Sequence, residues 1–172
     1  MVKLESVLEV PEGAAAILYD SGDYKLLRTH SERQGGRDCT AFDEVNSGEG
    51  IRNLTTRDLF GCAGVMYRNG DNYVLAHGTG MDNLRVLLGR VNQLSIEDAG
   101  KKPEEVDLCT PNEWINYEGV IKISLGEEVQ VRTHRKKLHF VGQSQSATIG
   151  KDILDFGDKQ TLIDRLFVMC GI

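Results

Sequence analysis

A hairpin signal in the middle of the chain constrains the fold most strongly. The turn sequence NGD, 69–71, lies between two apolar runs, LFGCAGVMYR at 59–68 and NYVLAHG at 72–78. Asn and Gly adopt positive φ easily, so this sequence favours a tight turn between antiparallel strands. The two runs are therefore predicted to pair. Cys62, near the start of the first strand, and His77, near the end of the second, would lie at the same end of the hairpin.

Short apolar runs separated by glycines continue through the rest of the chain, which holds 19 Gly and only three Pro. This punctuation favours strands and tight turns. One helix is predicted over 81–98, where apolar residues recur at helical spacing and Thr79 could cap the first turn. A second helix is predicted at 161–169, and further strands at 14–21, 24–30, 119–125, 128–134, 137–143 and 146–150.

Two stretches are predicted to connect these elements. The segment 30–51 is polar and Gly-rich and reads as a long loop with a short strand around RDCTAF, while 99–107 reads as a charged connector. Strands dominate the pattern and the helices are inserted between them. The sequence therefore predicts one α+β domain over residues 1–172, with a central β-sandwich or strongly bent mixed sheet flanked by helices.

Composition excludes several functional classes. The chain has 172 residues and a formal net charge of −6, which argues against nucleic acid and anionic membrane as partners. No apolar stretch approaches the roughly 18 residues that a membrane helix needs. The four cysteines, Cys39, Cys62, Cys109 and Cys170, contain no CxxC pair, so no zinc site is expected. A chain this long does not need disulfides, and we expect reduced thiols.

The Cys62–His77 pair carries the sharpest chemical hypothesis. With the turn centred on residue 70, Cys62 would be paired with position 77 or 78, at a distance where a thiol and an imidazole can share a proton. An imidazolium neighbour would lower the thiol pKa, and the histidine would then return the proton during attack on an acyl carbon. Gly61 would allow close approach, and the amides near Cys62, with Ala63 and Gly64 following, could hold an oxyanion. Against this, most strand cysteines are inert packing residues.

The residues L-x-G-C, at 59–62, followed by an apolar strand, a turn and a strand ending in His77, resemble the cysteine–histidine protein glutamine deamidases. That superfamily includes the chemotaxis receptor deamidase CheD, the catalytic domain of the cytotoxic necrotizing factors and Burkholderia lethal factor. Phe60 replaces the serine that usually precedes the glycine. The resemblance covers about 25 of the 172 residues.

The resemblance implies a β-sandwich flanked by helices and conversion of a protein glutamine to glutamate through a thioester. It also implies that a residue shortly before the cysteine orients the histidine, and Thr56 stands at that place. No metal or organic cofactor is implied. The spacing and the following helix look closer to the toxin and effector members. The expected location is therefore the bacterial cytoplasm, or a host cytosol after secretion.

Alternatives remain open at this point. The same dyad could perform a related acyl transfer, as a peptidase or transglutaminase, or the chain could be a noncatalytic protein-binding module. The basic run VRTHRKKLH, 131–139, could be a solvated hairpin turn or a docking patch. Trp114 and Tyr117 could be core or could contact a substrate protein. Cys39, Cys109, Cys170 and His30 are expected to be packing or surface residues, and the oligomeric state is not predicted.

Overall fold

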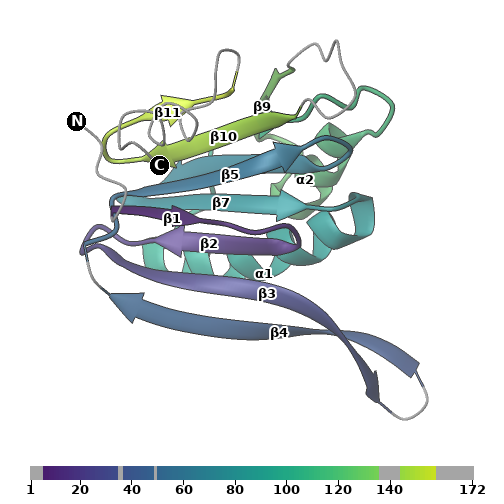
Figure 1. Ribbon diagram of the computed structural model, residues 1–172, viewed down its shortest axis with the longest axis horizontal. Helices are drawn as coiled ribbons and strands as arrows, with labels where there is room; N and C mark the ends of the chain where they lie inside the picture. The colour runs from purple at the N-terminus through teal and green to yellow at the C-terminus, as the bar shows by residue number, and fades with distance from the viewer. Residues whose placement is uncertain (1–5, 35–36, 49, 136–143, 158–172) are drawn as a thin grey trace, which may run out of the picture.

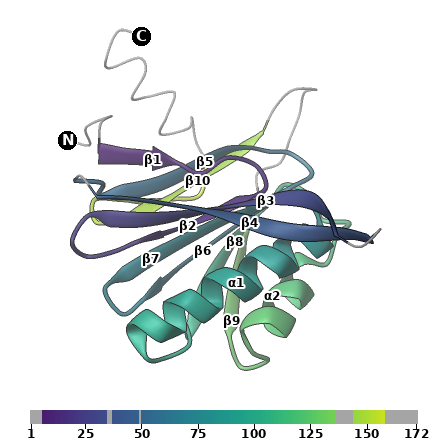
Figure 2. The same cartoon turned by 90° about the horizontal axis from the view of Figure 1, so that it is seen from below.

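The computed structural model describes residues 6–34, 37–48, 50–135 and 144–157. It contains two β-sheets packed face to face, and two helices cover the outer face of the larger sheet (Figure 1 and Figure 2). The predicted α+β class, with a β-sandwich flanked by helices, is confirmed. The elements are β1 (Val7–Glu9), β2 (Ala14–Leu18), β3 (Asp23–Gln34), β4 (Arg37–Gly48), β5 (Asn53–Leu59), β6 (Ala63–Asn69), β7 (Asn72–Gly78), α1 (Met81–Ala99), β8 (Glu105–Cys109), α2 (Tyr117–Leu125), β9 (Gln130–His134), β10 (Gln145–Gly150) and β11 (Leu154–Asp155).

The larger sheet has seven strands in the order β4-β3-β2-β7-β6-β8-β9. Its neighbours are antiparallel except for β8 and β9, which are parallel. Alternate side chains of β6 and β7 point to opposite faces, as strand geometry requires. Val65 and Ala76 pack toward the helices, whereas Met66 and Leu75 pack toward the other sheet. Burial on both faces explains why these strands read as continuous apolar runs.

The smaller sheet has the order β1-β5-β10-β11, so β5 is one of its two inner strands. β1 pairs with β5 in parallel over three residues, and β10 pairs with β5 antiparallel. Leu54 and Leu59 of β5 are fully buried in the core between the two sheets. Strand β5 therefore packs across the core against β6 and β7 of the larger sheet. As a result, residues from both sheets meet at one end of the sandwich.

Helix α1 matches the prediction closely, spanning Met81–Ala99. Its apolar stripe is buried against the seven-stranded sheet, with Leu84, Leu87, Leu88 and Val91 at its centre. Thr79 does not cap it, contrary to expectation. The N-cap is Gly80, and the Thr79 N–H donates to Asn83 Oδ1 instead. Among the described residues, no helix has the length and hydrophobicity that crossing a membrane requires.

Two sequence predictions about strands are wrong. The segment 119–125 forms helix α2, because its apolar residues Val120, Ile121 and Leu125 also lie on one helical face and are buried there. The Asn116 side chain caps this helix by accepting a hydrogen bond of 3.0 Å from the Gly119 N–H. Part of the predicted connector 99–107 forms β8, which is an inner strand of the larger sheet.

The prediction of a long loop over 30–51 is also wrong, although the short strand expected around RDCTAF is confirmed as part of β4. Most of it belongs to the hairpin of β3 and β4, which pair over twelve residues and extend beyond the body of the sheet (Figure 1). Ladder hydrogen bonds between the two strands satisfy the backbone even where the sequence is polar, so polarity does not exclude a strand. The predictions at 137–143 and 161–169 lie outside the described residues.

Candidate active site

Cys62 lies in a bend between two strands, and the predicted continuous strand 59–68 is wrong. β5 ends at Leu59 and β6 begins at Ala63, so residues 60–62 connect the two sheets. Asp58, one residue before the end of β5, has a φ of 62° that is uncommon for a residue other than glycine, and it lies where the pairing of β5 with β10 shifts register. The bend leaves the Cys62 side chain half-buried beside the core between the sheets.

The hairpin itself forms as predicted, but its register differs from the expected one. Asn69 pairs with Asn72 across a Gly70–Asp71 turn, and Gly64 therefore pairs with His77. The expected direct pairing of Cys62 with position 77 or 78 is wrong. Cys62 lies two positions before the residue opposite His77, which is the diagonal relation of an antiparallel ladder. Diagonal neighbours lie about 7–8 Å apart and remain within reach of longer side chains.

His77 is held by a threonine of the opposite sheet. Thr56 Oγ1 on β5 lies 2.7 Å from His77 Nδ1 and 2.8 Å from the carbonyl oxygen of Val10. A hydroxyl has one proton, and the Val10 carbonyl can only accept. The network is satisfied when Thr56 donates to Val10 and His77 Nδ1–H donates to Thr56. This arrangement places the ring proton on Nδ1 and leaves the lone pair on Nε2.

Gly64 allows this contact between the sheets. It lies directly opposite His77 on β6, and a Cβ at this position would come within 3.0 Å of Leu59 Cδ1 and 3.6 Å of Thr56 Cγ2. A side chain here would push β5 away from β6. Gly61 is under no such constraint, since a Cβ there would meet nothing closer than Asn112 Nδ2 at 4.0 Å.

The free nitrogen of His77 is a base without a partner. The residue is 2% exposed, and Nε2 has no hydrogen-bond partner in the part of the chain that the structure describes. Burial lowers the pKa of His77, while the nearby carboxylates of Glu12 and Asp58 partly oppose this change. The imidazole is therefore neutral at neutral pH, which is the form that can accept a proton.

Cys62 is paired with a carboxylate rather than with the imidazole. Its Sγ lies 3.6 Å from Glu12 Oε1, and the thiol donates to this oxygen. Burial, followed by the charge and the hydrogen bond of Glu12, raises the pKa of Cys62 to about 11. The sequence predicted an imidazolium that lowers the thiol pKa. The resting site instead holds a protonated thiol and a neutral imidazole, so attack on a substrate would require proton transfer to the base.

Two side chains fix the backbone of the Cys62 bend. The Tyr117 hydroxyl donates to the Gly61 carbonyl at 2.7 Å, and the Thr110 hydroxyl donates to the Cys62 carbonyl at 2.8 Å. In a trans peptide the N–H points opposite to the carbonyl, so the Cys62 N–H is directed away from Tyr117. Ala63 is the first β6 residue in register with β7, opposite Gly78. Of the predicted amides, the Cys62 N–H is therefore a better oxyanion candidate than the Ala63 N–H.

Sequence reasoning missed three of these contacts. Glu12 comes from the turn between β1 and β2, fifty residues before Cys62, and nothing in its local sequence marks it. Thr110 and Tyr117 flank the loop between β8 and α2. Tyr117 was considered as a contact for a substrate protein, but it is 1% exposed and holds the Gly61 carbonyl instead. Only the tertiary fold brings these segments to the cysteine.

Three exposed hydrophobic residues, called the apolar rim below, belong to segments that adjoin Cys62, His77 or Thr110 in the chain. The rim consists of Phe60, Met81 and Trp114, which are 59%, 47% and 89% exposed. Phe60 precedes Cys62 by two residues, Met81 begins α1 just after His77, and Trp114 lies in the loop after Thr110. Among the residues whose side-chain burial the structure describes, two other large hydrophobic residues are exposed, Ile123 and Leu154. Exposed aromatic residues gathered around a site are typical of protein recognition.

The remaining candidates do not join this site. Cys109 is fully buried, as expected for a packing residue. Within the basic run, Arg132 and His134 are bound to Asp107, at 3.1 and 2.9 Å, and His134 stacks on Phe156. These contacts are structural. The described residues contain no group of three or more His, Cys, Asp or Glu side chains arranged to hold a metal ion. Cys170 and His139 lie outside the described residues.

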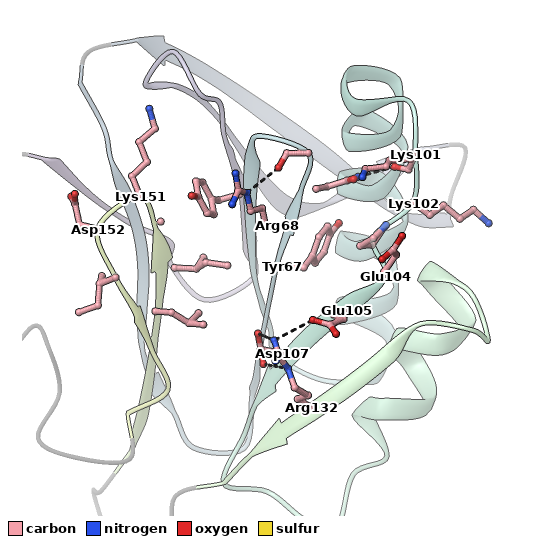
Figure 3. Close-up of a pocket in the computed structure, with 18 residues that line it drawn as sticks. Tyr67, Arg68, Lys101, Lys102, Glu104, Glu105, Asp107, Arg132, Lys151 and Asp152 are labelled. Carbon is pink, nitrogen blue, oxygen red and sulfur yellow. Dashed lines mark hydrogen bonds and ion pairs between the residues drawn. The ribbon is translucent and has the colours of Figure 1, made fainter.

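A cavity of about 550 Å³ lies at the other end of β6, between the two sheets. Figure 3 shows its charged lining, with Arg68 and Lys101 near the hairpin turn, and Arg132 beside Glu105 and Asp107. Positive and negative side chains line it in nearly equal number. Neither Cys62 nor His77 contributes to this cavity, so it is separate from the candidate active site.

In comparisons with known proteins, no protein-family model, no curated protein and no solved structure matches the chain.

Proposed function

We propose that this protein is a glutamine deamidase that acts on a partner protein through a Cys62–His77 dyad. His77 Nε2 takes the proton of the thiol as sulfur bonds to the carboxamide carbon. The proton then passes to the nitrogen, and the C–N bond breaks to release ammonia and leave a thioester. Water, deprotonated by the same Nε2, attacks the thioester, and sulfur leaves as the thiol. The net reaction is hydrolysis of a carboxamide to a carboxylate and ammonium.

The observation that carries the proposal is the state of His77. Its Nδ1–H is committed to Thr56, and its Nε2 is buried, unpaired and neutral, as a general base requires. A histidine kept only for packing would normally have both nitrogens satisfied. In this proposal Cys62 is the nucleophile, the Cys62 N–H stabilises the oxyanion, and Thr56 orients the base without touching the substrate.

The proposed substrate is a folded protein, because the nucleophile lies beside an exposed apolar rim. Phe60, Met81 and Trp114 offer a surface that a partner could cover around an inserted glutamine side chain. A bacterial effector that modifies a host protein would fit this arrangement, with either a bacterial or a host cytosol as its place of action. The new negative charge on the product could disrupt a contact of the modified protein.

The test compares lysates incubated with the wild-type protein and with a Cys62→Ser variant, using peptide mass spectrometry. We expect one or a few Gln-to-Glu conversions, each adding roughly 1 Da and one negative charge, in the wild-type sample alone. Circular dichroism of both proteins should agree, because the substitution is nearly isosteric. Truncated peptides would instead support a peptidase, and incorporation of an added primary amine a transglutaminase. Identical samples would contradict the dyad and favour a binding module.

A further inference from the structure

Glu12 stands beside the nucleophile on a turn that is tied to the site. The neighbouring Gly13 donates its N–H to the His77 carbonyl at 2.9 Å, and its own carbonyl accepts from Thr29 Oγ1 at 2.9 Å. Gly13 has a φ of 76°, which favours glycine and shapes this turn. Glu12 itself is exposed, and among the described residues it forms no ion pair with a Lys or Arg. Apart from the Cys62 thiol, no described side chain neutralises or occupies its carboxylate, which can therefore accept a hydrogen bond from a ligand.

We infer that Glu12 is the residue that recognises the substrate carboxamide, by accepting a hydrogen bond from its NH₂ group and repelling a carboxylate in the same place. This inference rests on the proposed function. The carboxamide carbon must bond to Cys62 Sγ, and Glu12 Oε1 is 3.6 Å from that sulfur. An oxygen at this distance can meet the attached nitrogen at the roughly 2.9 Å of an N–H···O bond.

The donor and acceptor pattern supports this assignment. An ionised carboxylate can only accept hydrogen bonds, a carboxamide NH₂ can only donate them, and a product carboxylate offers no donor. In the resting site the thiol proton occupies the Glu12 acceptor. When that proton moves to His77, the substrate NH₂ can take its place. With the nitrogen held at Glu12, the carbonyl oxygen is turned away from it, toward the backbone N–H groups of the bend.

The same contact would distinguish substrate from product. After hydrolysis a second carboxylate stands beside Glu12, and two like charges at this separation repel each other. The product would leave readily, and glutamate side chains on other proteins would bind poorly. A site that must act on Gln among many Glu side chains needs such discrimination, and hydrogen-bonding groups supply it more strongly than apolar pockets do.

The test uses two small alkylating reagents that differ only in this group. Iodoacetamide carries a carboxamide and iodoacetate a carboxylate, and both react at Cys62 sulfur. We measure the ratio of their rate constants at one pH, in the wild type and in Glu12→Gln, by mass spectrometry of the Cys62 peptide. Both reagents react with the same thiolate, so the ratio cancels any change that the substitution makes in the thiol pKa. The assay needs no protein substrate.

We expect the ratio of the iodoacetamide to the iodoacetate rate constant to be about five- to tenfold higher in the wild type than in Glu12→Gln. This factor corresponds to the repulsion between two like charges near the protein surface. Glu104→Gln, at the far end of β6, is the matched control and should leave the ratio at its wild-type value. Equal ratios in wild type and Glu12→Gln would overturn the inference. Glu12→Gln could lower the ratio as expected while the wild type produces no Gln-to-Glu conversion in lysates. Glu12 would then still discriminate against carboxylates, but the deamidase reaction would be rejected, so the two failures are distinguishable.

Discussion

At the scale of single residues, one hydroxyl group sets the protonation pattern of the site. Thr56 donates to Val10 and accepts from His77, and this sequence of hydrogen bonds decides which ring nitrogen is the base. The contact also explains why the sequence could point to Thr56 and His77. Thr56 lies on the strand before the hairpin and His77 lies on the hairpin itself. The resemblance to deamidases implied that Thr56 orients His77. Glu12 could not be predicted, because its position depends on how the turn that links β1 of the smaller sheet to β2 of the larger sheet lies beside the Cys62 bend.

We predict that Thr56→Val will disturb the tautomer of His77. Without the hydroxyl, the Val10 carbonyl and His77 Nδ1 lose their partner, at a cost of about 1–3 kcal/mol in the free energy of unfolding. Nitrogen NMR of the imidazole should show the Nδ1–H form in the wild type and a mixture in the variant. The value of kcat should fall about 10- to 100-fold, part of what general acid–base catalysis contributes. Thr56→Ser keeps the hydroxyl and should show the wild-type NMR spectrum and the wild-type kcat. If the spectrum of Thr56→Val equals that of the wild type, Thr56 does not position His77.

We predict that His77 destabilises the fold in mild acid. Its pKa is lowered in the folded state by burial, so below the ordinary value near 6.5 the unfolded chain binds a proton that the folded protein resists. The stability is complete above pH 6.5 and is lost as the pH falls toward the folded-state pKa, by at most about 1.4 kcal/mol per pH unit. Urea unfolding between pH 7 and pH 5 should show this slope in the wild type, and a smaller one in His77→Gln. Equal slopes in the wild type and in His77→Gln would mean that folding does not lower the pKa of His77.

At the scale of elements, the site depends on a close approach between β5 and β6. The sequence predicted the hairpin, helix α1 and most strands, because local periodicity determines them. It failed for α2, where branched apolar residues favour a strand by propensity but pack as a helix. It also failed for the bend at 60–62, where the chain leaves one sheet for the other. Such a crossover is a tertiary feature, and the apolar run continues across it without a break.

We predict opposite effects for two glycine substitutions that are three residues apart. Gly64→Ala places a methyl group 3.0 Å from Leu59 Cδ1 and should destabilise the protein by about 1–3 kcal/mol, as overpacking does. Gly61→Ala meets open space and should leave stability unchanged or raise it by up to about 1 kcal/mol, since alanine restricts the unfolded chain. Chemical denaturation of both variants checks this. Similar losses in the two would show that the bend, rather than the approach of β5, limits stability.

At the scale of the whole molecule, the apolar rim faces solvent and should act only through a partner. We predict that Trp114→Ala leaves the free energy of unfolding within about 0.5 kcal/mol of the wild type, because the side chain is 89% exposed. Truncation of a central aromatic contact costs about 2 kcal/mol or more in binding, so kcat/KM for the modified protein should fall more than tenfold. Alkylation of Cys62 by iodoacetamide should not change.

Ile123→Ala is the matched control for this prediction, since Ile123 is 73% exposed on α2 and does not belong to the rim. It should have no effect on kcat/KM. Equal losses in both variants would show that general surface hydrophobicity, rather than the rim, recruits the substrate.

The order of strands in the smaller sheet has a consequence for synthesis of the protein. β5, which carries Thr56, has only three paired residues with β1, and its main partner is β10, where Ala147 lies opposite Thr56. In a nascent chain, Cys62 and His77 are synthesised long before β10, so until then β5 and its Thr56 lack their main pairing partner. Under the proposed function, the dyad would become ordered only after β10 has been synthesised, so a ribosome-bound fragment that lacks β10 would be inactive.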